Sequence, residues 1–346
     1  MKPKQEMNFS LVSKQSVEIF ASMFKDIDSS TYTLLRAATI PNNIHEDVDY
    51  EYLPESCLKN FFEVLSQRVS ADKAGWLFLR TCKEVYVPKS IAAISNRDSL
   101  KSALDEFCER LKLQSTAANI YLENKGNSWW LVREKSGLEE KWFNYAEMFS
   151  VIGMAEVLRA LTNDQWYPTR IGIQSSHIDE FSSLPSLERA QFFIERPVTA
   201  LEIPESLLNM PVVVPTTNSL LGAQAVPDFS SMSFSEQLTL AISPYLSMGK
   251  LPIKLAAEIL RMNVRTLQRK LSAENIVYKS FIERLVFDEV KKRLRETDEP
   301  ITRLANRFGY SDSAHFSRSF KRIFGLTPSA FRLSSRYSRV HHANRV

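Results

Sequence analysis

The chain has 346 residues, of which 44% are hydrophobic and 24% are charged, a composition typical of a globular protein. This length exceeds what one hydrophobic core usually organises, so we expect two domains. No apolar run approaches the ~20 residues that a membrane-spanning helix needs, and the N-terminal segment MKPKQEMNFS lacks the apolar core of a signal peptide. The composition therefore excludes a membrane protein and predicts a cytoplasmic location.

The residues that usually mark catalytic or metal sites form no recognisable motif. Cys57, Cys82 and Cys108 contain no CxxC pair and are odd in number, which favours reduced thiols. His45 and Glu46 have no partner at the HExxH spacing of a zinc site, so we expect no metal and no cofactor. The glycines are too scattered for a dinucleotide-binding, phosphate-binding or nucleophile-elbow motif, and the sequence therefore does not predict an enzyme.

The charge is divided unevenly along the chain. Residues 1–228 contain 23 Lys and Arg against 30 Asp and Glu, a net charge of −7, whereas residues 229–346 contain 21 against 10, a net charge of +11. A reversal of this size indicates that the C-terminal third binds a polyanion and that the rest does something else. The alternative is that the C-terminal third is basic without binding a polyanion.

Residues 1–228 are expected to form an α+β domain, because helical and strand-like patterns are intermixed without a regular βαβ repeat. The predicted helices are 10–26, 55–69, 97–113 and 145–161, and the predicted strands are 117–123, 128–133, 170–174 and 197–203. Residues 124–127, Asn-Lys-Gly-Asn, predict a hairpin turn between the first two strands.

The helix at 145–161 is the most apolar of the chain. Such a helix is buried, either inside its own domain or against a second copy of the chain. After it, the composition from 216 to 235 turns to small and polar residues with almost no charge. This change predicts a linker at 229–237, followed by a C-terminal domain at 238–334.

Residues 309–332 predict a turn, a helix and a stop. Gly309 suits a left-handed residue that ends a preceding helix, and Ser311 is the predicted N-cap of the next one. Phe316 and Phe320 give this helix an apolar stripe, while basic residues occupy its other face. A short helix with one packed and one cationic face is what a reader of the DNA major groove requires.

A related turn and helix lie 48 to 49 residues earlier, with a short helix at 255–260, an N-cap at Asn263 and a helix at 264–273. The matched residues are Ala257 with Ala305, Leu260 with Phe308 and Asn263 with Ser311 at 48, then Leu267, Arg269 and Leu271 with Phe316, Arg318 and Phe320 at 49. A predicted helix at 280–297 separates the copies. At about 27 Å it would hold two recognition helices near the ~34 Å repeat of successive major grooves.

From Ala305 to Arg332 the chain carries the pattern A-x-x-x-G-[YF]-S-D-x-x-H-F-x-R-x-F-K-x-x-F-G-x-[ST]-P-x-x-[FY]-R. This pattern and the tandem arrangement over 238–334 resemble the DNA-binding module of the AraC/XylS transcription regulators. The resemblance implies an all-α C-terminal domain with two helix-turn-helix motifs joined by a long helix. It also implies double-stranded promoter DNA and RNA polymerase as partners.

The resemblance implies that the residues at the family's base-contacting positions contact bases here as well. These residues are Arg265, Gln268 and Arg269 in the first motif and Ala314, His315 and Arg318 in the second. Arg binds guanine through two acceptors, Gln pairs with adenine, and Ala offers a methyl contact to thymine. Phosphate contacts are expected from Thr266, Lys270, Ser313, Ser317, Lys321 and Arg322. Intradomain ion pairs are the alternative for Arg269 and Arg318, and helix packing is the alternative for His315.

The N-terminal domain resembles the arabinose-binding-type regulatory domain of the ornithine-regulator-like branch of that family. The resemblance rests on His177-Ile178-Asp179, Phe192-Phe193 and the block from Pro197-Val198 to Pro211-Val212. The chain departs from the pattern at Ile194-Glu195-Arg196, where a small residue would precede Pro197. An effector-binding domain is implied, but the effector and the residues that bind it are not.

The expected function is therefore that of a sequence-specific DNA-binding regulator, an activator controlled by a small molecule bound to residues 1–228. A ligand-independent dimeric activator, in which residues 1–228 serve self-association, is the alternative. An enzyme with a DNA-binding appendage is disfavoured, because residues 1–228 show no reactive group of side chains. Residues 335–346 are expected to form a disordered basic tail.

Overall fold

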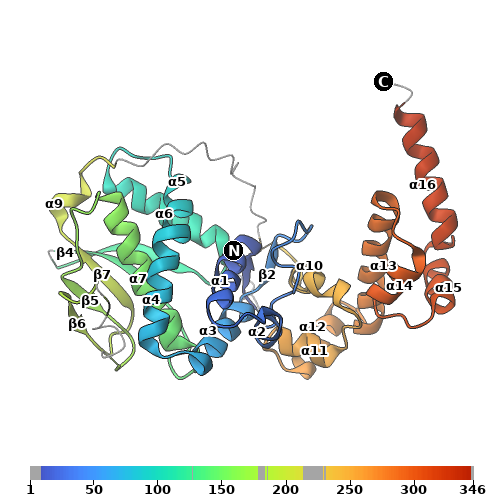
Figure 1. Cartoon of the computed structure of the whole chain (residues 1–346), viewed down its shortest axis with the longest axis horizontal. Helices are drawn as coiled ribbons and strands as arrows, with labels where there is room; N and C mark the ends of the chain where they lie inside the picture. The colour runs from blue at the N-terminus through green and yellow to red at the C-terminus, as the bar shows by residue number, and fades with distance from the viewer. Residues whose placement is uncertain are drawn as a thin grey trace. The chain divides into compact units, whose positions relative to one another are not determined.

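The computed structural model of the chain describes residues 9–126, 128–177, 184, 186–212, 229 and 231–343, with side chains described up to residue 335. The chain divides into two compact units (Figure 1). Phe9–Asp228 form one, called here the N-terminal unit, and Phe229–Val346 lie in the other, called the C-terminal unit. The reversal of net charge along the sequence falls at the boundary between these units.

The N-terminal unit is built from intermixed helices and strands, which confirms the predicted α+β class. Its helical elements are α1 (Lys14–Ser22), η1 (Met23–Asp26), α2 (Thr31–Ala37), α3 (Ser56–Arg68), α4 (Ala71–Thr81), η2 (Cys82–Tyr86), α5 (Val87–Ala92), α6 (Leu100–Gln114), α7 (Phe143–Leu161) and α9 (Glu205–Leu208). Its strands are β1 (Leu11–Ser13), β2 (Tyr52–Pro54), β3 (Asn119–Lys125), β4 (Ser128–Glu134), β5 (Arg170–Gly172), β6 (Gln191–Phe193) and β7 (Thr199–Ile203).

The main sheet has the strand order β3-β4-β7-β5-β6, in which only β5 and β6 are parallel. Strands β3 and β4 form the predicted hairpin, with Lys125 opposite Ser128. Leu131 of β4 and its partner Leu201 of β7 are fully buried. Helix α6 packs against β3 and α7 against β7, so one face of the sheet is covered by helices. Alternate residues of each strand therefore point into this helical layer.

Helix α7 is the centre of the N-terminal unit. Every residue from Tyr145 to Leu158 is buried, and α3, α4, α5 and β7 all pack against the helix. A helix that is apolar all round needs neighbours on every side. The neighbours come from its own unit, which decides between the two alternatives that the sequence left open.

Glu147 places a carboxylate inside this core, where it is 2% exposed. Its oxygens accept hydrogen bonds from the Gln174 amide at 2.7 Å, the Ser175 amide at 3.1 Å and the Thr199 hydroxyl at 2.6 Å. Because a buried carboxylate without donors is costly, these three groups replace the water that folding removes. They also tie α7 to β7 and to the segment after β5.

The prediction of a single helix over residues 10–26 is wrong at its start. Residues 11–13 form β1, which pairs with β2 so that Val12 lies opposite Leu53. Helix α1 begins at Lys14, because the Ser13 hydroxyl caps it by accepting a bond from the Ser16 amide at 3.2 Å. A short apolar run fits a strand as well as a helix, and the capping serine was the signal that separated them.

Among its described residues, the C-terminal unit contains helices joined by turns and no strand. Its elements are α10 (Phe234–Ile242), η3 (Ser243–Met248), α11 (Ile253–Ile259), α12 (Val264–Ala273), α13 (Tyr278–Glu296), α14 (Ile301–Arg307), α15 (Ser313–Phe324) and α16 (Pro328–Ala343). Helix α10 begins inside the predicted linker 229–237, since Ser233 and Glu236 form a capping box. Helix α16 continues to Ala343, into the tail 335–346 for which disorder was predicted, because no glycine or proline stops it.

The turns before α12 and α15 share their backbone geometry. Arg261 and Gly309 are left-handed, with φ values of 47° and 77°. In each turn the amide of the following residue donates to the carbonyl five residues earlier, at 2.8 Å and 2.9 Å. These bonds are those of a Schellman helix ending, for which glycine is the least strained residue.

Gly309 also lies closely against another part of its unit. A Cβ atom at this position would lie 2.6 Å from the backbone nitrogen of Lys250 and 3.0 Å from the carbonyl carbon of Gly249. Both neighbours are backbone atoms, which cannot move aside as a side chain would. Glycine is therefore required here for close packing as well as for its positive φ.

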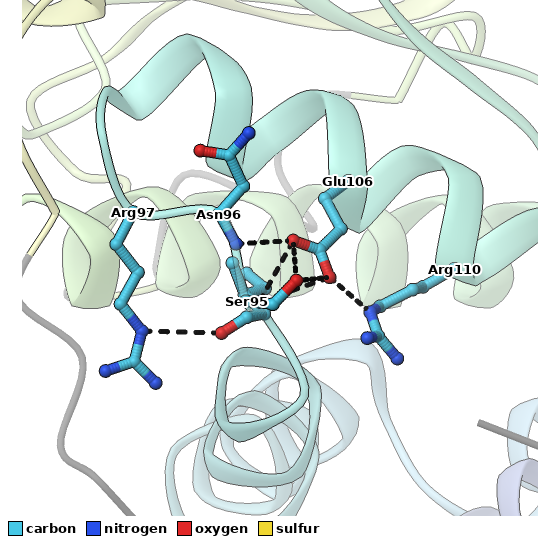
Figure 2. A network of polar contacts seen from close by, with 6 residues as sticks. Ser95, Asn96, Arg97, Glu106 and Arg110 are labelled. Carbon is cyan, nitrogen blue, oxygen red and sulfur yellow. Dashed lines mark hydrogen bonds and ion pairs between the residues drawn. The ribbon is translucent and has the colours of Figure 1, made fainter. Parts of the chain in front are cut away.

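A polar network fastens the loop between α5 and α6 (Figure 2). The Glu106 carboxylate accepts bonds from the amide and hydroxyl of Ser95, from the Asn96 amide at 2.8 Å and from Arg110 Nε at 2.8 Å. Arg97 donates to a backbone carbonyl in the same loop at 3.4 Å. One carboxylate thus fixes the chain entering α6.

Among the described residues, every helix is either too short or too polar to span a bilayer.

Replacing Glu106 by Gln tests this network. Burial would raise the pKa of Glu106, but the bonds from Asn96, Arg110 and Ser95 outweigh burial and lower it. A lowered carboxyl pKa stabilises the fold above the unfolded-state pKa, and this stabilisation is lost as the pH falls through the folded-state pKa. Urea unfolding of Glu106→Gln should show a loss of about 1 kcal/mol at pH 7 that shrinks below about pH 4.

The matched control for Glu106→Gln is Glu109→Gln on the same helix, whose carboxylate is exposed and bonds only to Lys112 in the described contacts. It should leave the unfolding curve nearly unchanged. A loss in Glu106→Gln that is equal at about pH 2 and at pH 7 would contradict the assignment.

Gly309→Ala is expected to destabilise the C-terminal unit more than Gly325→Ala does. Both glycines are left-handed, with φ values of 77° and 76°, so each alanine costs about 1 kcal/mol of backbone strain. Only at Gly309 would the new methyl group also meet backbone atoms, since nothing lies within 4 Å of the Cβ position at Gly325. Thermal unfolding should separate the two variants, and equal losses would contradict the packing argument.

Candidate nucleic-acid interface

Helix α12 presents a polar face held in place by a buried apolar one. Asn263 caps the helix, because its side-chain oxygen accepts a bond from the Arg265 amide at 2.8 Å. Leu267 and Leu271 are fully buried, as predicted. Arg265 and the neighbouring Gln268 and Arg269 are exposed. At spacings of three and four residues these side chains share one face of the helix.

Helix α15 has the same construction, with its start one residue later than predicted. Asp312, not Ser311, is the N-cap, and its carboxylate accepts bonds from the amides of Ala314 at 2.8 Å and His315 at 3.1 Å. A carboxylate has two acceptor oxygens where the serine hydroxyl has one, and it is favoured at the positive end of the helix dipole. These two backbone bonds and the nearby Arg318 lower the pKa of Asp312.

This correction also changes the internal alignment of the two helix pairs. Asn263 corresponds to Asp312 at an offset of 49 residues, whereas the first helices of the pairs, α11 and α14, start 48 residues apart. The extra residue therefore lies in the turn before α15.

The packed face of α15 contains the predicted aromatic stripe. Phe316 and Phe320 are fully buried, and both rings contact Phe287 of α13, at centroid distances of 5.5 Å and 5.7 Å. Phe324 is half-buried and lies 4.8 Å from Phe320. The aromatic contacts orient α15 so that its other face is left to solvent.

On that outer face Ser313, Ala314, His315 and Arg318 are exposed. Arg318 lies 3.8 Å from an Asp312 oxygen, and both side chains are more than half exposed. An exposed pair at this distance contributes little, so it does not prevent Arg318 from binding elsewhere. The ring centroids of His315 and Tyr310 lie 5.6 Å apart, and His315 is exposed. The His315 side chain can therefore pack against Tyr310 and still contact a partner.

The residues predicted to contact phosphates are less uniform. Lys321 is exposed, whereas Thr266 and Ser317 are half-buried. Lys270 lies over the Phe234 ring at 5.7 Å, and Arg322 forms an ion pair with Glu283 of α13. Sequence reasoning missed the role of Glu283, because α13 contains several acids and only the three-dimensional contact distinguishes this one.

Arg269 differs from Arg318 and Arg322 in its contacts. Among the described residues it forms no ion pair or hydrogen bond, so the intradomain pair considered for it is absent there. No group of three or more possible metal ligands occurs in the part of the chain that the structure describes. The site therefore offers cationic and amide groups to a partner.

Comparison with known proteins bears on this surface. The family model described as "Helix-turn-helix domain" matches residues 256–334, which run from α11 into α16. The HTH-type transcriptional activator RhaS of Enterobacter sp. (strain 638) is 35% identical over 77 residues, 22% of this chain and 28% of RhaS. The RhaS protein of Salmonella arizonae is 26% identical over 188 residues, 54% of this chain and 65% of that protein.

The HTH-type transcriptional regulator VirS of Mycobacterium tuberculosis is 31% identical over 112 residues, 32% of each chain. The chain thus spans less than two thirds of the length of these curated relatives. The solved structure of the transcriptional regulator CdpR from Pseudomonas aeruginosa aligns over 95% of this chain and 100% of CdpR, with 13% identity and a low TM-score of 0.33. The family model spans the helices that carry the polar faces described above. Together with these relatives it supports the resemblance of residues 256–334 to the helix-turn-helix domains of the AraC/XylS regulators.

Proposed function

We propose that the chain is a transcription regulator of the AraC/XylS type, which binds promoter DNA through α12 and α15 and is controlled by a small molecule bound in its N-terminal unit. The observation that carries the DNA-binding proposal is the row of exposed side chains on each of these helices, opposite a fully buried apolar face. A helix packed in this way can enter a major groove without exposing its own core.

Base recognition is assigned to the six residues predicted from the sequence. Arg265, Arg269 and Arg318 would grip guanine through its two major-groove acceptors, and Gln268 would pair with adenine. Ala314 offers only a methyl group and His315 a single donor or acceptor, so α12 carries more of the discrimination than α15. Phosphate contacts are assigned to Thr266, Lys270, Ser313, Ser317, Lys321 and Arg322, with Arg322 first having to leave Glu283.

The two helix pairs α11–α12 and α14–α15 are proposed to act as helix-turn-helix motifs joined by α13. This helix has 19 residues, which gives a length of about 28 Å. That length suits two recognition helices that enter successive major grooves, ~34 Å apart on one face of DNA. One chain would then contact two grooves.

An interior cavity supports the sensory role of the N-terminal unit. It has a volume of about 110 Å³ and lies between helices α1, α3, α6 and α7, the segment η2, and strands β3 and β4. Its lining is largely apolar with a few polar groups, as in pockets that bind small ligands, although its volume suits only a very small one. A ligand there would control DNA binding by favouring one of two states, provided that its affinity differs between them.

Self-association and contact with RNA polymerase are also proposed, from the resemblance to the family. Helix α7 does not offer a surface for self-association, because it is buried within its own unit. In the alternative function, the chain is a dimeric activator whose N-terminal unit binds no ligand. Affinity for DNA that never changes with any small molecule would favour that alternative.

Arg269→Ala and Arg318→Ala test the base contacts. Binding sites selected from a randomised duplex pool would be titrated with each variant at fixed salt concentration. Each substitution should cost about 1–3 kcal/mol and relax specificity at the base pair that the arginine contacts. The loss of specificity should be larger for Arg269→Ala. Lys112→Ala, which removes a lysine from the N-terminal unit, is the charge control, and affinity and specificity that stay unchanged in both arginine variants would overturn the assignment.

Lys321→Ala tests a phosphate contact. Because a phosphate contact carries no sequence information, binding should weaken about equally on selected and unrelated duplexes. The slope of log affinity against log salt concentration should fall by about 1, since one fewer counterion is released. A change confined to the selected site would show instead that Lys321 reads a base.

A further inference from the structure

The inward face of β4 carries charge where its pattern calls for an apolar residue. Leu131 is fully buried against the helices, and Arg133, two residues along, lies on the same face and directly opposite the buried Ile120 of β3. Lys135 follows beyond the end of the strand. Arg133 and Lys135 both line the interior cavity.

Glu55 and Glu147 act on Arg133 electrostatically but do not contact it directly. Among the described residues its guanidinium forms no hydrogen bond or ion pair. Glu55 is held by Lys135 at 3.5 Å and by Lys59 at 3.6 Å, and Glu147 is occupied by its three donors. Arg133 and Lys135 thus line the cavity near Glu55, while Lys59 lines only the outer pocket beside it. The Arg133 guanidinium can offer two parallel donors to an anion.

Burial lowers the pKa values of both Arg133 and Lys135. Desolvation lowers the pKa of Arg133, and Tyr86, Glu55 and Glu147 act against it. Desolvation and the neighbouring Arg133 lower the pKa of Lys135 to about 7, although Glu55 opposes this. A group whose charged form is disfavoured in this way gains from any anion placed beside it.

The rest of the cavity is apolar. Its lining includes Phe20, Phe62, Phe107, Leu111, Phe149 and Met154. A volume of about 110 Å³ is somewhat below the ~150 Å³ cavity that accommodates benzene in another protein. The body of a ligand here is therefore no larger than about a single ring.

A second pocket lies beside the charged end of the cavity. An outer pocket on the same unit, with a volume of about 520 Å³, shares Glu55, Ala117 and Lys135 with the interior cavity. These shared residues mark where the two spaces adjoin. Lys135 lines both spaces, whereas Arg133 lines only the interior cavity.

We infer that the effector is a small monocarboxylate whose carboxylate binds Arg133 and Lys135 and whose short aliphatic or single-ring body fills the apolar part of the cavity. This inference rests on the proposed sensory role of the N-terminal unit and names the chemistry of its ligand. The carboxylate supplies Arg133 with the direct ion pair that no described carboxylate makes, and the rings exclude water from this contact.

The test uses the full chain and two matched sets of probes. The first set contains butanoate, hexanoate, octanoate, benzoate and phenylacetate, and the second contains their uncharged primary amides. Melting temperature and calorimetric titration report binding. At least one acid should bind, and its amide should bind at least tenfold more weakly.

Arg133→Met should weaken the binding acid at least tenfold, whereas Arg133→Lys, which keeps the charge but not the two parallel donors, should fall between Arg133→Met and the unsubstituted chain. Arg170→Met is the control, because Arg170 lies in the same sheet and pairs with Glu202 without lining the cavity. A cooperative melting transition in each variant shows that it folds. Acid affinity that is unchanged in both Arg133 variants, or amides that bind as well as acids, would overturn the inference.

A third set of uncharged sugars and of amines separates this inference from the proposed function. If only members of that set stabilise the chain, the cavity senses a different class of molecule and the carboxylate inference is wrong. If no compound in any of the three sets binds, both the carboxylate inference and the proposed sensory role of the N-terminal unit are wrong. DNA binding, measured on the same protein, is independent of both results.

Discussion

The hydrogen bonds to the buried Glu147 carboxylate link the parts of the N-terminal unit. They join α7 to Thr199 of β7 and to the amides of Gln174 and Ser175. The Gln174 side chain in turn donates to the carbonyl of Lys135 at 3.1 Å. A carboxylate in the central helix is therefore connected through one residue to the charged end of the cavity, so the position of that end depends on how α7 is packed.

The C-terminal unit was largely predictable, because its information is local. Asn263 followed by a helix with Leu267 and Leu271 at a spacing of four residues leaves few alternatives, and the structure has that cap and those buried residues. The error at Ser311 was small, since Asp312 is an equally good capping residue one position later. The ion pair of Arg322 with Glu283 could not be predicted, as it joins residues from two different helices.

The cavity of the N-terminal unit could not be predicted from the sequence for a different reason. Its lining comes from segments between Val12 and Met154 that are brought together only by folding. One signal was present: Arg133 interrupts the alternation of a strand in which Leu131 is buried. Without the partner strands, an arginine at that position could equally have ended the buried part of the strand. His177 of the segment that resembles a regulatory domain is described, whereas Ile178 and Asp179 lie outside the described residues.

The unequal turns and unequal side chains of the two helix pairs bear on the DNA site itself. The turn before α15 has one more residue than the turn before α12, and the two outer faces present different groups. Under the proposed function a single bound chain cannot recognise a palindrome, because its two halves do not read the same bases. The DNA site would therefore have a direction. Inverting the site in a promoter would reverse the orientation of the bound chain relative to the transcription start.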